Sequence, residues 1–75
     1  MTDLDQQLRV MCPLNPIELS LIRHIANGDT RVMGARACGL SPNSINATMT
    51  RIFHKIGAAS SANAVATALR HGWIA

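Results

Sequence analysis

One side of the segment between Gly39 and Gly57 carries amides, hydroxyls and cations, and the segment contains no carboxylate. Asparagine side chains can bond the edges of bases, and hydroxyl and methyl groups can contact them too. Arginine and lysine bind phosphate oxygens. The polar residues on this side are Asn43, Ser44, Asn46, Thr48, Thr50, Arg51 and Lys55. Together these residue types indicate a surface that can lie in the major groove of DNA.

A helix is needed to hold these side chains on one side, and helix signals bracket the segment. Ser41 is placed to cap the free amides of a first turn, and Pro42 suits the first helical position. Gly57 supplies a left-handed stop. Apolar residues recur at helical spacing on the opposite side, namely Ile45, Met49, Ile52, Phe53 and Ile56. The spacing predicts a helix over residues 42–56 with that side buried.

A helix with a complete start signal is predicted before this segment. Asn15 is the cap, Pro16 is the first helical residue, and Glu18 can reach back to the cap as in a capping box. Gly28 ends the helix.

A second, shorter helix is predicted from a cap at Asp29 or Thr30 to Cys38. Its inward residues are expected to be Met33, Ala37 and Cys38. Gly34 interrupts it, and a mid-helix glycine costs about 1 kcal/mol relative to alanine. Either the helix is loosened at Gly34, or another backbone approaches closely there.

The short helix, the turn at Gly39 and the helix 42–56 form a helix-turn-helix unit. A last helix is predicted from Ser60 or Ser61 to Gly72, with an inner stripe made of Ala64, Val65, Ala68 and Leu69. Residues 1–12 are predicted to form a short amphipathic arm, in which Leu4, Leu8 and Met11 share one stripe. The arm can pack on its own domain or on a second copy. The fold class is all-α, with one domain over residues 13–75.

The positive charge of the chain is concentrated in its middle. Residues 29–57 hold four of the seven Arg and Lys but only one of the four Asp and Glu. A surface that meets phosphates is expected to have this distribution, although charge alone also allows a solvated basic face without a partner. The sequence shows no basic-then-apolar leader and no apolar run of membrane-spanning length, so we expect a cytoplasmic protein.

Catalytic and metal-binding functions find little support in the residue pattern. His24, His54 and His71 lack the spacing of metal ligands, and Cys12 and Cys38 match no metal or disulfide spacing. With only four Asp and Glu residues in the chain, neither a Ser/His/Asp arrangement nor a pair of catalytic carboxylates can be identified. We therefore expect no enzyme activity, no metal and no cofactor, and we expect His54 to contact a phosphate.

With these residues in place, the chain resembles a DNA-binding domain of the LuxR/GerE type. The resemblance runs from Leu14 to Ile74 and is carried by the stretches 14–19, 25–28, 39–41, 44–45, 51–52, 55–57, 64–66 and 69–72. It implies four helices, with the third in the major groove and the fourth forming a homodimer on inverted-repeat DNA. Most relatives carry a sensing domain in front of this one, and the sequence shows none. The chain therefore resembles a stand-alone GerE-like regulator of bacterial or phage type, and we expect no fused sensor.

Two sets of site residues follow as expectations. The DNA-binding set is Asn43, Ser44, Asn46, Ala47, Thr48, Thr50, Arg51, His54, Lys55 and Arg31. The dimer set is Ala62, Val65, Ala66, Leu69 and Trp73. Arg51 and Lys55 are expected to bind phosphates, and the residues of the first turns are expected to contact bases.

The family usually has a basic residue at the position of Asn46, so the third helix is weakly cationic here. This departure keeps open a different function. The chain could act as an antagonist that binds a related LuxR-type regulator through its last helix. RNA polymerase is a further possible protein partner of a DNA-bound regulator.

Overall fold

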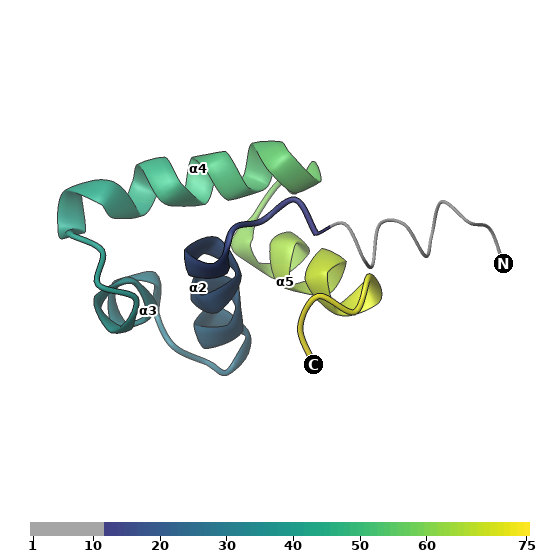
Figure 1. The fold of residues 1–75 in the computed structure, drawn as a ribbon, viewed down its shortest axis with the longest axis horizontal. Coiled ribbons are helices and arrows are strands. Elements are labelled where there is room, and N and C mark those ends of the chain that lie inside the picture. Colours follow the sequence, from purple (N-terminus) through teal and green to yellow (C-terminus); the bar gives the residue numbers. More distant parts are fainter. Residues whose placement is uncertain (1–11) are drawn as a thin grey trace, which may run out of the picture.

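A computed structural model describes residues 12–75 of the chain. Its elements are α2 (Pro16–Ala26), α3 (Arg31–Ala37), the 3-10 turn η1 (Pro42–Ser44), α4 (Ile45–Ile56) and α5 (Ser61–Arg70). All regular structure in this range is helical, which confirms the predicted all-α class (Figure 1). The predicted arm over residues 1–12 lies outside the described residues except for Cys12.

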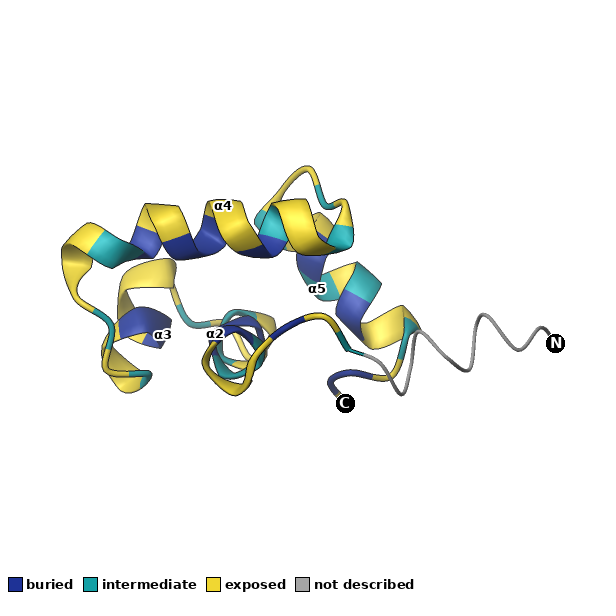
Figure 2. Cartoon of the chain, turned by 45° about the horizontal axis from the view of Figure 1, so that its top comes forward, coloured by how far each residue is buried: buried dark blue, intermediate teal, exposed yellow. Residues whose placement is uncertain are grey.

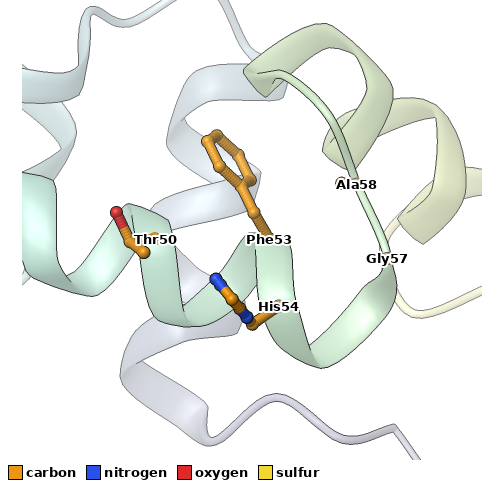
Figure 3. Close-up of a pocket in the computed structure, with 5 residues that line it drawn as sticks. All are labelled: Thr50, Phe53, His54, Gly57 and Ala58. Carbon is orange, nitrogen blue, oxygen red and sulfur yellow. The ribbon is translucent and has the colours of Figure 1, made fainter.

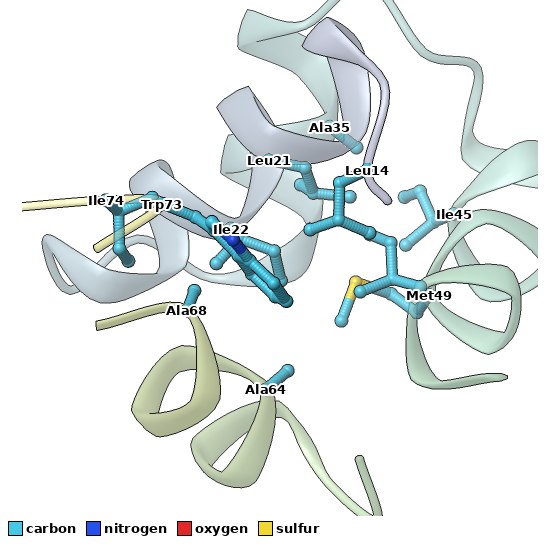
Figure 4. Packing of buried hydrophobic residues seen from close by; sticks show 11 residues of the cluster. Leu14, Leu21, Ile22, Ala35, Ile45, Met49, Ala64, Ala68, Trp73 and Ile74 are labelled. Carbon is cyan, nitrogen blue, oxygen red and sulfur yellow. The ribbon is translucent and has the colours of Figure 1, made fainter. Parts of the chain in front are cut away.

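The helix α2 packs between α3 and α5, and α4 runs across the bundle so that it contacts α3 and α5 (Figure 1). Their facing sides enclose an aliphatic core with Trp73 as its one large ring. Figure 4 shows Ala64 and Ala68 of α5 pointing toward Ile22 and Trp73. Alanines at these two positions let α5 come close to α2, because their side chains take little space. The fully enclosed residues of largest volume are Leu21, Ile22, Met49, Ile52 and Glu18.

The start of α2 follows its sequence signal. The amide of Glu18 donates to Asn15 Oδ1 over 2.8 Å, and the Asn15 amide donates to Glu18 Oε1 over 2.9 Å. This reciprocal pair confirms the predicted capping box.

The glycine in α3 lies at a close contact between α2 and α3. A Cβ added to Gly34 would lie 3.0 Å from Leu21 Cδ1 and 3.1 Å from His24 Cβ. Of the two alternatives at Gly34, close approach by a neighbouring helix is the one observed, although side chains rather than backbone make the contact. Gly34 and Ala35 are therefore the inward residues of α3. The prediction that Met33 and Ala37 face inward was wrong, since both are exposed.

The predicted helix 42–56 forms, but its first turn is a 3-10 turn rather than α-helix. The predicted capping by Ser41 was wrong. Its side chain caps no backbone amide, and its hydroxyl instead lies 2.9 Å from the Ser44 hydroxyl. At the other end, Gly57 adopts the left-handed conformation with φ 68°, as predicted.

The last helix buries one side and leaves another open. Ser60 caps it by accepting a hydrogen bond from the Asn63 amide. Ala64 and Ala68 are fully buried, whereas Leu69, predicted to lie on the inner stripe, is 48% exposed. The inner stripe is therefore narrower than its sequence indicated.

The contact at Gly34 generates a stability prediction. Replacing Gly34 with alanine should gain about 1 kcal/mol of helix propensity but lose about 1–3 kcal/mol through overpacking against Leu21 and His24. We expect a net loss that lowers the melting temperature by several degrees, measured by circular dichroism. Ala37→Gly, at an exposed position of α3, is the control, because it changes helix propensity without changing packing. A higher melting temperature for Gly34→Ala would show that α2 shifts to accommodate the added methyl group without a loss of stability.

Candidate nucleic-acid interface

The outer side of α4 forms one continuous exposed stripe. Helical geometry explains this, because residues separated by alternate steps of three and one lie on the same side of a 3.6-residue turn. Figure 2 shows the exposed residues along the outer side of α4 and the buried ones beneath. The stripe begins at Asn43 of η1 and continues on α4 with Asn46, Ala47, Thr50, Arg51 and His54. We call these six residues the α4 stripe; all six belong to the predicted DNA-binding set.

Four residues of the predicted DNA-binding set do not lie on the α4 stripe, namely Arg31, Ser44, Thr48 and Lys55, and two of these, Ser44 and Thr48, are at least partly buried. Thr48 is only 4% exposed, so its assignment to the polar outer side was wrong. It lies three residues after Ile45 and four before Ile52, and it therefore shares their buried side. Ser44 is half-buried, with its hydroxyl paired to that of Ser41.

Below one flank of the α4 stripe lies a buried carboxylate. The Glu18 side chain is 1% exposed, and Lys55 Nζ donates to Glu18 Oε1 over 2.7 Å. Arg51 Nη1 lies 4.0 Å from Glu18 Oε2, which is too long for a hydrogen bond. The ammonium of Lys55 is thus held inward, although Lys55 was predicted to bind phosphate. The side chain of Arg51 stays more than half exposed.

The opposite flank of the α4 stripe carries a cation from another helix. Arg31, at the start of α3, lies over the Phe53 ring with its guanidinium carbon 5.7 Å from the ring centroid. Its Nε and Nη2 both donate to Ser61 Oγ, over 3.1 and 2.9 Å. The ring and the hydroxyl together hold Arg31 beside the C-terminal half of α4. Phe53 and Ser61 were not among the predicted site residues.

A shallow hollow of about 460 Å³ adjoins this flank. Figure 3 shows its lining: Thr50, Phe53 and His54 from α4, and Gly57 and Ala58 from the turn that follows. Thr50 and His54 belong also to the α4 stripe, so the hollow continues the same exposed surface. Its walls are apolar or neutral apart from the imidazole of His54.

Among residues 12–75, every Asp and Glu side chain has a cationic or imidazole partner. After Asp29 the sequence contains no Asp or Glu. The two acidic side chains within residues 12–75 are both engaged, Glu18 as described and Asp29 with His24 Nδ1 at 2.9 Å. In the same range, no three His, Cys, Asp or Glu side chains form a group able to hold a metal ion.

The predicted dimer residues separate into two groups. Ala62, Ala66 and Leu69 share one exposed side of α5, at spacings of four and three. Val65 is half-buried against the core. The assignment of Trp73 to an interface was wrong, because its ring is buried at 7% exposure and stacks on His71 with centroids 4.8 Å apart.

No family model, curated protein or solved structure matches this chain. Within residues 12–75, no helix combines the length and the apolar character needed to cross a membrane. The function of the chain has to be inferred from its own residues.

The buried carboxylate generates a second stability prediction. Lys55→Ala should lower the free energy of unfolding by about 2 kcal/mol, less than the 3–5 kcal/mol typical of fully buried pairs because Lys55 is partly exposed. Arg51→Ala is the matched control, and it should change the free energy by no more than about 0.5 kcal/mol. Urea denaturation measures both. Equal effects would mean that Glu18 does not depend on Lys55.

Proposed function

We propose that this chain is a cytoplasmic transcription regulator that binds double-stranded DNA with the α4 stripe in the major groove. The observation that carries the proposal is the composition of the α4 stripe: two asparagines, a threonine, an alanine methyl and two basic side chains on one side of a rigid helix. Asparagine bonds adenine bidentately, and a methyl group can contact thymine. The apolar side of α4 is anchored in the core, so these groups keep fixed positions.

The charges on the two flanks support the same orientation. A helix in the major groove lies between two phosphate backbones, one on each side. Arg51 lies on one flank of the α4 stripe, and Arg31, held by Phe53 and Ser61, lies on the other. Each backbone would therefore meet a guanidinium, which fixes the register of the helix without reading sequence.

The resemblance to LuxR/GerE-type domains supports a dimer on an inverted repeat. The exposed side of α5 formed by Ala62, Ala66 and Leu69 is the proposed seam, because small residues let two helices come close and Leu69 adds apolar area. A two-fold dimer would place two α4 helices about 34–36 Å apart, one turn of DNA.

Selection of bound sequences from a random pool of duplex DNA tests the proposal directly. An enriched inverted repeat with A·T pairs in each half would support it. The absence of enrichment by a folded protein would overturn it.

Asn46 is expected to read a base. Asn46→Ala should change the preferred base at one position of each half-site and lose about 1–3 kcal/mol of discrimination there, because a bidentate pair with adenine is lost. The control is Asn27→Ala, an exposed asparagine beyond the end of α2. Repeating the selection with both variants makes the comparison. An unchanged preference for Asn46→Ala would remove Asn46 from the contact set.

Ala66 is expected to lie in the seam. Ala66→Glu should shift sedimentation at micromolar concentration from dimer to monomer, since a charge in a packed interface is desolvated. Ala26→Glu places the same charge on an exposed alanine of α2 and should leave the dimer intact. Persistence of the dimer in Ala66→Glu would place the contact elsewhere on the chain.

One observation favours the alternative function, an antagonist that captures a related LuxR-type regulator through α5. Of the two cations of α4, Lys55 is paired with Glu18, which leaves the DNA-facing side weakly charged. An antagonist needs the seam but not the α4 stripe. Formation of mixed dimers with such a regulator, together with no shift of duplex DNA by the protein alone, would favour this function.

A further inference from the structure

A single buried carboxylate lies beneath both cations of α4. Arg51 and Lys55 are four residues apart, so they lie one above the other on the helix, and Glu18 of α2 reaches between them. Oε1 of Glu18 is fully engaged by the Asn15 amide and Lys55 Nζ. Oε2 is also buried, but it has no hydrogen-bond partner.

The two cations differ in what they can offer to a phosphate. Lys55 has a short, charge-assisted bond to a carboxylate that water barely reaches, and breaking it would leave that carboxylate without its counter-charge. Arg51 is held by no hydrogen bond to Glu18, and its side chain is more than half exposed, so its guanidinium can turn toward a phosphate. Its distance of 4.0 Å from the unsatisfied Oε2 shows that it also feels the negative charge of Glu18.

We infer that Glu18 limits the sequence-independent affinity of this protein for DNA by withholding Lys55 from phosphates and leaving Arg51 as the phosphate-binding cation of α4. The inference rests on the proposed function. It makes Glu18 a specificity-determining residue, because a smaller phosphate contribution raises the relative weight of the base contacts made by the α4 stripe.

The salt dependence of binding measures this effect. Each phosphate neutralised by a protein cation adds about 0.9 to the slope of log affinity against log salt concentration. Between about 50 and 200 mM salt, one extra contact therefore costs a further threefold to fourfold in affinity. A cation that stays on Glu18 contributes nothing to this slope.

The test compares the wild type, Glu18→Gln and the double variant Glu18→Gln with Lys55→Gln on random-sequence duplex DNA. Glutamine can still accept the Asn15 amide in a capping box, while the charge that holds Lys55 is gone. We expect Glu18→Gln to bind random DNA more tightly and to steepen the slope by about 0.9. The double variant, which lacks the freed ammonium, should return to the wild-type slope.

Two results would overturn the inference: equal slopes for the wild type and Glu18→Gln, or a double variant as steep as Glu18→Gln. A measurement on the wild type decides the matter if a variant fails to fold. In nitrogen-15-labelled protein, added DNA should shift the Nε–H resonance of Arg51 and leave the ammonium resonance of Lys55 in place; comparable shifts would overturn the inference. Absence of binding by all folded forms at about 50 mM salt would overturn the proposed function as well.

Discussion

The buried carboxylate of Glu18 connects the first turn of α2 to the last turn of α4 and constrains how these two helices lie. One oxygen of this side chain accepts from the Asn15 amide and from Lys55 Nζ, so it caps one helix and fixes the end of another 37 positions further on. A carboxylate that is 1% exposed is unfavourable unless it is paired, and the pairing is satisfied only when α4 lies in its observed position. The same bond that orients α4 therefore also determines which of its cations faces outward.

Local signals in the sequence predicted most of the secondary structure. Asn15 with Glu18, Thr30 and Ser60 are caps whose hydrogen bonds involve residues three positions away. The apolar spacing of Ile45, Met49 and Ile52 likewise fixes the buried side of α4. These features could be predicted because each depends on neighbours within one or two turns. The α4 stripe could be predicted from the same spacing, since the positions of the helix that are not buried have to face outward.

The sequence-based predictions were wrong where a polar residue occupies a buried helix position or where segments distant in the sequence come into contact. Thr48 looks polar, yet helical geometry places it beside Ile45 and Ile52. Gly34 faces Leu21 and His24 of α2, and this contact turns Met33 outward. The pairs Glu18–Lys55 and Arg31–Ser61 join residues 37 and 30 positions apart, so no local pattern contains them. Such contacts decide which predicted cations are free, and only the tertiary structure supplies them.

The sparse charge of α4 and the exposed apolar side of α5 fit together if two copies of the chain bind DNA jointly. If the proposed function holds, a single copy with a guanidinium on each flank would make few phosphate contacts, and such contacts supply most sequence-independent affinity. Joining two copies makes the second binding event intramolecular, so affinity rises without any added cation. The gain is realised only when both half-sites carry the right bases at the right spacing. A weakly charged α4 stripe therefore fits the proposed dimer, which would discriminate among DNA sites by sequence rather than by charge.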